Sequence, residues 1–309
     1  MRGWFRPLAT LLVVLSILAL ALLVPSGAAL AEGLVPLPID SSPGPKPDPK
    51  AYLADQAGYE DESITVQVYK DRAQDTNVLV ARVQIKDASQ LRTAPSDTWR
   101  HVGNKQAATI ARRYNAVAAI NGDFFQFSAE RYIVRQGELI RNRPTGEDLL
   151  LIDDQGDFHI LQGAKRPQIQ DFSEQLQGQG REVVNAFSFG PALVLNGQAI
   201  FPEKTNYFNT AALKQTQRSI ICQLGPLDYM IVSTEGPEDP GSVGFRLAEA
   251  AQYCVQAARS FFDKDCLVAY NLDGGSSNSL VLNNEKINSP QNPKKRAVSD
   301  IIYFATLVR

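Results

Sequence analysis

The chain has 309 residues, of which 44% are hydrophobic and 21% are charged, and its formal net charge is −2. This composition is typical of a globular protein with a sizeable core. The near-neutral charge excludes a broad basic surface, so we predict no nucleic-acid partner. The two histidines, His101 and His159, lie in no acidic or glycine-rich cluster, and we predict neither a bound metal nor a cofactor.

The N-terminus has the pattern of a targeting segment. Arg2 and Arg6 precede an uncharged apolar run from Leu8 to Val24, and Ala29-Leu30-Ala31 fits a small-x-small cleavage site. The run is long for a signal peptide and slightly short for a membrane-spanning helix. We therefore expect residues 1–31 to be a signal peptide or an uncleaved membrane anchor, the only expected contact with a membrane. The rest of the chain is expected outside the cytoplasm, secreted or anchored.

A proline-rich segment follows, with six prolines between residues 32 and 51. Its composition predicts an extended, solvated linker. Residues 52–309 are then expected to form a single domain. The three cysteines, Cys222, Cys254 and Cys266, fall in apolar segments, which favours small buried side chains over metal ligands and leaves one disulfide open.

The domain alternates short strand patterns with two helical patterns. Strands are predicted, in chain order, at 64–70, 78–85, 116–120, 132–135, 149–153, 158–161, 187–195, 219–224, 229–233, 266–271 and 301–307. Helices are predicted at 104–114 and 245–259. This order predicts an α+β fold, in mixed α/β layers, with a largely antiparallel or mixed sheet and two main helices.

Two of the predicted strands end in similar polar clusters. The strand at 116–120 runs into Asn121-Gly122-Asp123, and the strand at 266–271 runs into Asn271-Leu-Asp273-Gly274-Gly275-Ser276-Ser277. Glycines allow backbone N–H groups to approach a ligand closely. Each cluster alone is also typical of a solvated turn. Together they indicate two halves of one cleft.

Two arginines are candidates to complete this cleft. Gln217-Arg218-Ser219 opens a predicted strand, and Arg296 precedes the last one. A guanidinium suits bidentate binding of a phosphate or a carboxylate, although an arginine at a strand end can equally be a solvated flank.

These segments occur together in an order that resembles a known family. With Phe-Gly-Pro-Ala-Leu at 189–193, Gln-Arg-Ser-Ile at 217–220 and the helix at 245–259, they resemble the phosphodiester glycosidase family, related to N-acetylglucosamine-1-phosphodiester α-N-acetylglucosaminidase. The resemblance covers roughly residues 100–306, and its most specific block is Asn271-Leu-Asp-Gly-Gly. One departure is Asp123, where the family commonly has a second glycine.

The resemblance implies an exported hydrolase that cleaves the C1–O bond of a sugar 1-phosphodiester, so its partner is a carbohydrate-phosphate substrate. Phosphate is a good leaving group, which lowers the need for a strong general acid. Asp273 is then expected to stabilise the oxocarbenium-like carbon or to activate water, with Asp123 and Arg218 as further catalytic residues. The remaining residues of the clusters are expected to bind substrate: Asn121, Gly122, Ser219, Asn271, Gly274, Gly275, Ser276, Ser277 and Arg296.

Two other functions fit the same cleft. One is a non-catalytic envelope module that binds glycan or phosphate. The other is a phosphoesterase that cuts the P–O bond with a divalent cation held by Asp123 and Asp273.

Overall fold

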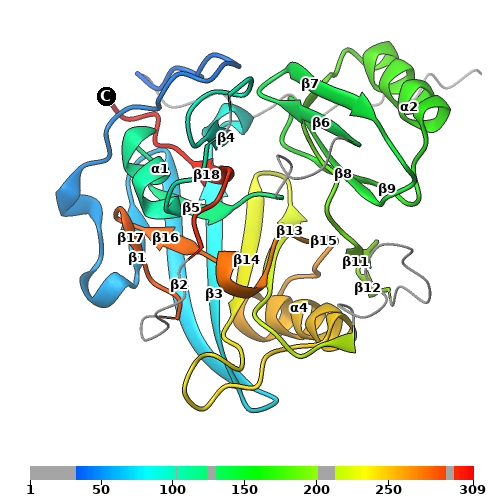
Figure 1. Ribbon diagram of the computed structural model, residues 1–309. Helices are drawn as coiled ribbons and strands as arrows, with labels where there is room; N and C mark the ends of the chain where they lie inside the picture. Colours follow the sequence, from blue (N-terminus) through cyan, green and yellow to red (C-terminus); the bar gives the residue numbers. More distant parts are fainter. Residues whose placement is uncertain (1–32, 102, 124–129, 201–212, 290–295) are drawn as a thin grey trace, which may run out of the picture.

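The computed structural model describes residues 33–101, 103–123, 130–200, 213–289 and 296–309. The predicted targeting segment, residues 1–31, lies outside the described residues. Within the described residues the chain has the predicted α+β fold, with three α-helices and three sheets in which the named strands all pair antiparallel (Figure 1). No helix among these residues is long and apolar enough to cross a membrane.

The largest sheet has eight strands and carries most of the predicted strand patterns. Its order is β1 (Gly58–Glu60), β2 (Ile64–Ala73), β3 (Thr76–Ile85), β14 (Asp228–Thr234), β13 (Ser219–Gly225), β15 (Val268–Asn271), β11 (Ala192–Leu195) and β12 (Gln198–Ala199). The long β2–β3 hairpin pairs from Ile64 with Ile85 to Ala73 with Thr76.

Two five-stranded sheets pack above it. One has the order β17 (Glu285–Lys286), β16 (Leu280–Leu282), β5 (Ala118–Asn121), β18 (Asp300–Phe304) and β4 (Leu91–Pro95). The other has the order β7 (Glu138–Arg143), β6 (Arg131–Arg135), β10 (Val183–Phe187), β8 (Leu149–Asp153) and β9 (Phe158–Leu161). The main core lies between the sheets and includes Val66, Ile231, Tyr270, Phe187 and Phe304.

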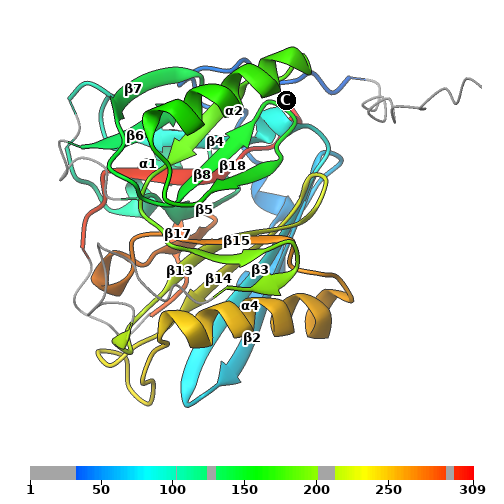
Figure 2. The same ribbon diagram turned by 90° about the vertical axis from the view of Figure 1, so that its right-hand side faces the viewer.

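Three helices pack on these sheets, and two of them, α2 (Arg166–Gly178) and α4 (Leu247–Phe262), lie on opposite sides of the molecule (Figure 2). Helix α4 (Leu247–Phe262) packs on the eight-stranded sheet, α1 (Ala107–Arg113) on the sheet of β5 and β18, and α2 (Arg166–Gly178) on the sheet of β8. The apolar positions of α4, such as Leu247, Ala251, Cys254 and Ala258, recur at helical spacing and are buried. The two predicted helices are α1 and α4. The prediction missed α2, which is a third helix.

The proline-rich segment differs from the predicted solvated linker. Its residues 37–44 lie against the domain, where the Leu37 side chain is buried. The buried guanidinium of Arg92 donates to the carbonyl oxygens of Pro38, Asp40 and Ser42 at 2.9, 2.9 and 3.1 Å. Because proline has no N–H group, this segment cannot pair as a regular strand. Its carbonyl oxygens accept instead from the guanidinium of Arg92, which has five donors.

The cysteines behave as the apolar pattern predicts. Cys222, Cys254 and Cys266 are free and buried in the core between the eight-stranded sheet and α4. The disulfide that the sequence left open does not form among them.

Candidate active site

The two polar clusters that follow β5 and β15 meet, and Asn121 joins them. Its amide nitrogen Nδ2 donates to the main-chain oxygen of Asp273 at 2.7 Å. Its Oδ1 accepts from the hydroxyl of Ser219 at 2.8 Å and from the N–H of Ser279 at 3.0 Å. The N–H of Asp273 donates to Gly122 O at 3.3 Å. The buried side chain of Asn121 therefore links the segments that follow β5 and β15, and both its Nδ2 and its Oδ1 already form hydrogen bonds.

Two glycines make this close approach possible. A Cβ on Gly122 would lie 2.2 Å from Oδ1 of Asp300, and a Cβ on Gly274 would lie 2.5 Å from Gln217 O. Neither space admits a side chain without movement of the neighbours. Gly122 thus serves the site by leaving room for the Asp300 carboxylate.

Asp273 is the partly exposed carboxylate of the site. Burial raises the pKa of Asp273 to about 6, while the Ser277 hydroxyl and the charge of Arg296 lower it and the charge of Asp123 raises it further. A carboxyl group with a pKa near the working pH can exchange a proton during a reaction, as a general acid or base requires.

A small pocket brings Asp273 together with a carboxylate that sequence reasoning missed. The pocket is lined by Asn104, Gly122, Asp273, Ala297, Val298, Ser299 and Asp300. Its volume of about 10 Å³ is enough for about one water molecule. Asp300 is the first residue of β18 and is followed by an apolar strand pattern. An acidic residue beside such a pattern was the signal in the sequence that could have identified it as a site residue.

Asp300 shares a single buried cation with Asp123. Nη2 of Arg135 lies 2.7 Å from Oδ1 of Asp123 and 3.1 Å from Oδ2 of Asp300. The guanidinium also stacks over the ring of Phe187, 4.1 Å from its centroid. Burial raises the pKa of Asp300 to about 7, with Arg135 opposing the shift and the Asp123 charge adding to it. One cation thus serves two buried acids, and Asp300 holds a proton up to near neutral pH.

Asp123 itself is fully engaged. Its Oδ1 accepts from Arg135, and its Oδ2 accepts from the N–H of Ser188 at 3.0 Å. Its side chain has no solvent exposure. These contacts hold Arg135 and the β10 end in place, and they leave Asp123 less accessible to a substrate than Asp273.

The guanidinium of Arg218 turns toward main-chain carbonyls. Its Nε donates to Phe245 O at 2.8 Å, and Nη2 donates to Lys214 O at 2.7 Å. Burial lowers the pKa of Arg218 to about 10, and the charge of Glu249 on α4 raises it in part. The backbone of Arg218 lies in the site, since its Cα is near Gly274.

The arginines whose charges act on Asp273 are Arg296 and Arg131, and both lower the pKa of its carboxyl group. Arg296 is exposed, and its N–H donates to Ser276 O at 3.1 Å, which attaches the predicted residue to the cleft. Arg131 is buried at the start of β6 and donates through Nη1 to Ser188 O at 2.6 Å. Arg131 was missed because it directly precedes an ordinary strand pattern and belongs to none of the polar motifs.

The remaining loop residues offer polar atoms of two kinds. The N–H groups of Gly275 and Ser277 donate to Gln217 O and Gly274 O at 3.0 and 3.2 Å, so both are already in use. Nδ2 of Asn271 donates to Gly190 O at 2.8 Å. Oδ1 of Asn271 and Oγ of Ser277 are buried without a hydrogen bond that meets ordinary geometry. Such unsatisfied atoms are rare in folded proteins and are candidates for contacts with a water molecule or a ligand.

A metal centre is not evident in the part of the chain that the structure describes. No group of three or more histidine, cysteine, aspartate or glutamate side chains is placed there to hold an ion. The site is instead a carboxylate pocket, with arginines beside it, where the ends of β5, β15 and β18 meet in an antiparallel α+β fold.

Comparison with known proteins gives the family of this chain. The phosphodiester glycosidase family model matches residues 114–305. The chain belongs to the phosphodiester glycosidase family. No curated protein matches the sequence.

Comparison with solved structures gives two bacterial proteins. A hypothetical protein from Synechocystis superposes with a TM-score of 0.56 at 16% identity, over 78% of this chain and 62% of that chain. A predicted exported protein from Burkholderia pseudomallei K96243 gives a TM-score of 0.46 at 14% identity, over 74% of each chain. The chain thus spans less than two thirds of the Synechocystis protein, and that likeness concerns the fold alone.

Proposed function

We propose that this protein is an extracytoplasmic glycosidase that hydrolyses the C1–O bond of a sugar 1-phosphodiester on an envelope or secreted glycoconjugate. The observation that carries the proposal is the pocket shared by Asp273 and Asp300, because it lies where the family motifs converge. Export is supported by the targeting pattern of residues 1–31.

The chemistry follows from the two carboxyl groups. A water oxygen bonds to C1 as the bond from C1 to the phosphate oxygen breaks, and a phosphate monoester leaves with the electron pair. Asp273, ionised above pH about 6, accepts the proton of that water or stabilises the positive carbon. Asp300 carries a proton near neutral pH and is the candidate to return one to the departing oxygen.

Cations assist the leaving phosphate. Arg296 and Arg131 lie close enough to influence Asp273, and positive charge there stabilises the negative charge that develops on the phosphate. A direct contact of Arg218 with the phosphate stays a prediction, because its guanidinium must then exchange main-chain carbonyls for substrate oxygens. Oδ1 of Asn271 is a polar atom still available for a sugar hydroxyl, whereas the Ser277 hydroxyl already interacts with Asp273.

Hydrolysis of a small panel of sugar 1-phosphodiesters in ¹⁸O-labelled water tests the proposal on the full-length protein. The label should enter the C1 hydroxyl of the released sugar, and kcat/KM should rise with an apparent pKa of about 6 as Asp273 ionises. Label in the phosphate would identify a phosphoesterase, and saturable binding without turnover would identify a binding module. Either result would overturn the proposed reaction.

A further inference from the structure

Asn278 directly follows the turn Gly275–Ser277 and is buried, with 1% of its surface exposed. Its Oδ1 accepts from the hydroxyl of Ser233 at 2.9 Å, and its Nδ2 donates to Thr234 O at 2.8 Å. Its main-chain oxygen accepts from Nδ2 of Asn288 at 3.1 Å. One residue thus connects the turn to the end of β14 and to the segment that follows β17.

Further hydrogen bonds close the turn itself. The N–H of Asn278 donates to Gly275 O at 3.1 Å. The hydroxyl of Ser279 donates to Ser277 O at 3.0 Å. Buried polar groups such as these hold one arrangement, because each group left without a partner would cost free energy.

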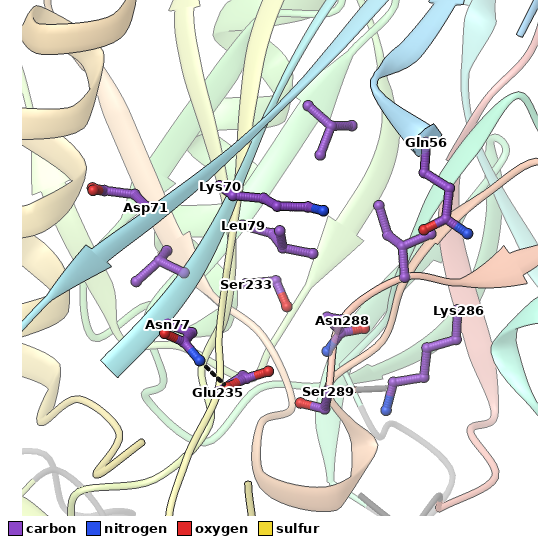
Figure 3. A pocket seen from close by; sticks show the side chains of 13 residues that line it. Gln56, Lys70, Asp71, Asn77, Leu79, Ser233, Glu235, Lys286, Asn288 and Ser289 are labelled. Atoms are coloured by element: carbon purple, nitrogen blue, oxygen red, sulfur yellow. Dashed lines mark hydrogen bonds between the residues drawn. The ribbon is translucent and has the colours of Figure 1, made fainter. Parts of the chain in front are cut away.

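The partners of Asn278 border a cavity of about 430 Å³ beside the β2–β3 hairpin (Figure 3). Figure 3 shows Ser233 and Asn288 in the wall of this cavity, on different segments of the chain. Oδ1 of Asn288 accepts from Leu280 N at 2.7 Å, so both ends of its amide are in use. On the cavity side these two side chains meet open space and not a packed core. The position of Asn278, which is bonded to both, therefore depends on hydrogen bonds.

The turn carries two groups that act on the Asp273 carboxyl. Burial raises the pKa of Asp273, and the Ser277 hydroxyl and the charge of Arg296 lower it. Arg296 is attached to the turn, because its N–H donates to Ser276 O at 3.1 Å. A displacement of the turn would therefore weaken both interactions at once.

The other charges around Asp273 come from elements outside the turn. Arg131 at the start of β6 lowers the pKa of Asp273, and Asp123, which follows β5, raises it. Asp300, the first residue of β18, lines the same pocket. These groups do not move with the turn. A change in the turn should therefore alter the proton affinity of Asp273 through the two groups that the turn carries.

We infer that Asn278 is a positioning residue for the proposed hydrolysis, which holds the turn Gly275–Ser277 so that the Ser277 hydroxyl stays beside the Asp273 carboxyl. This inference rests on the proposed function. Asn278 lies outside the lining of the Asp273 pocket, and Ser233 and Thr234 occupy its side-chain amide. A misplacement of reacting groups by about 1 Å can lower a rate by about 100-fold, so an amide next to the turn can control the reaction without contact with the substrate.

The pH profile of hydrolysis by an Asn278→Ala variant of the full-length protein tests the inference. With the same sugar 1-phosphodiesters, we expect kcat per folded molecule to fall by about 10–100-fold and KM to change by less than about threefold, because no substrate contact is lost. The apparent pKa of kcat/KM should lie above the wild-type value of about 6, since the Ser277 hydroxyl lowers it less.

Gln90→Ala is the matched control. Gln90 is a buried amide whose Nε2 donates to Ala305 O at 2.9 Å and whose Oε1 accepts from Lys86 N at 2.9 Å. Ala305 follows the end of β18, opposite to the end that carries Asp300. This variant should lose stability, with kcat and the apparent pKa of the wild type in its folded fraction.

A merely structural role would give a different result. If Asn278→Ala has a lower melting temperature but wild-type kcat and apparent pKa per folded molecule, the inference is overturned. Ser233→Ala removes one donor to Asn278 and serves if Asn278→Ala does not fold. It should change kcat and the apparent pKa in the same directions by smaller amounts, and wild-type values would again overturn the inference.

Failure of the proposed function can be distinguished from failure of this inference. If the wild type releases no sugar from any diester, ¹³C NMR titration of the aspartate carboxyl carbons measures the pKa of Asp273 directly, with Asp273→Asn for the assignment. A higher pKa in Asn278→Ala than in the wild type and in Gln90→Ala would support the positioning role and count against the glycosidase. Equal values in the three proteins would overturn the positioning role as well.

Discussion

Buried aspartates occur in two places in this protein, and the two places differ in how many hydrogen-bond donors and positive charges surround each carboxylate. At the candidate site, one guanidinium, that of Arg135, serves both Asp123 and Asp300. In the sheet of β8 and β9, the buried carboxylate of Asp153 contacts Arg181, which also lies 2.6 Å from Asp157, and has a further partner in Nε2 of His159 at 2.6 Å.

The consequence appears in their proton affinities. Burial raises the pKa of Asp300 to about 7, because Arg135 offsets the cost of burial only in part and the charge of Asp123 adds to the shift. Burial also acts to raise the pKa of Asp153, but hydrogen bonds from His159, Arg181 and the Asp157 N–H outweigh it, and the pKa is lowered. A shortage of donors therefore leaves a carboxyl group that titrates near neutral pH, whereas an ample supply of donors lowers the pKa of a buried carboxyl group.

The largest expected effect is on activity. Asp273→Asn should lower kcat/KM for a sugar 1-phosphodiester by about 10²–10⁴-fold, because an amide can neither accept the proton nor carry the negative charge. Circular dichroism should be unchanged, since Asp273 is partly exposed. Asp153→Asn is the matched control from the other cluster, and its activity per folded molecule should equal that of the wild type. Wild-type turnover by Asp273→Asn would remove this residue from the mechanism.

Loss of the shared cation should cost stability. Arg135→Leu leaves Asp123 and Asp300 buried without their counter-ion, and the free energy of unfolding should fall by about 3–5 kcal/mol. Urea unfolding at pH 7 measures this change. The variant should recover part of the loss at pH 5, where Asp300 is protonated. A change below about 1 kcal/mol at pH 7 would show that Asp123 and Asp300 do not depend on Arg135 as their counter-ion.

The pH dependence of stability should carry the sign of a raised carboxyl pKa. The pKa of Asp300 is about 7 in the folded protein and about 3.9 in an unfolded chain, so the folded state binds more protons between these values. The free energy of unfolding should therefore decrease as the pH rises from about 4 to about 7. Asp273, with a folded pKa of about 6, acts in the same direction. Asp153, whose pKa is lowered, contributes stability that is lost only as the pH falls into the acid range.

Asp300→Asn provides the measurement. Unfolding by urea at several pH values between 4 and 8 should show a shallower decline in this variant than in the wild type, because its amide cannot titrate. Parallel curves would mean that Asp300 is ionised throughout this range.

The smallest effect is expected in the well-balanced cluster. Arg181 is partly exposed. When Arg181 is removed, Asp153 retains His159 and two main-chain donors as partners. Arg181→Leu should lower the free energy of unfolding by about 0–1 kcal/mol and leave hydrolysis unchanged. A loss as large as that of Arg135→Leu would show that the two clusters do not differ in the way their donors indicate.

Local sequence patterns were informative wherever periodicity or a motif acts over a few residues. Helix α4 was predicted because its buried positions repeat at helical spacing, and β15 because a short apolar run precedes Asn271. Helix α2 was missed because polar residues dominate its composition, although Pro167 lies in its first turn and Ile169, Phe172 and Leu176 share one face.

The meeting of distant segments was predicted only where two motifs repeat each other. Asn121 and Asp273 follow similar strand patterns, and the structure joins them through one amide. Asp300, Arg135 and Arg131 have no such local signal. Their proximity depends on the order β5, β18 in one sheet and on the approach of β6 to it, which are pairings between residues far apart in the chain.

The sequence by itself determined the α+β class, the family and the segments that form the candidate site, because these depend on short-range patterns of polarity and glycine. Only the tertiary structure decided which carboxyl groups share a pocket, which arginine neutralises them and where Arg218 directs its guanidinium. The physical reason is that the proton affinity of a buried acid depends on the charges and donors around it, and the fold alone brings those together.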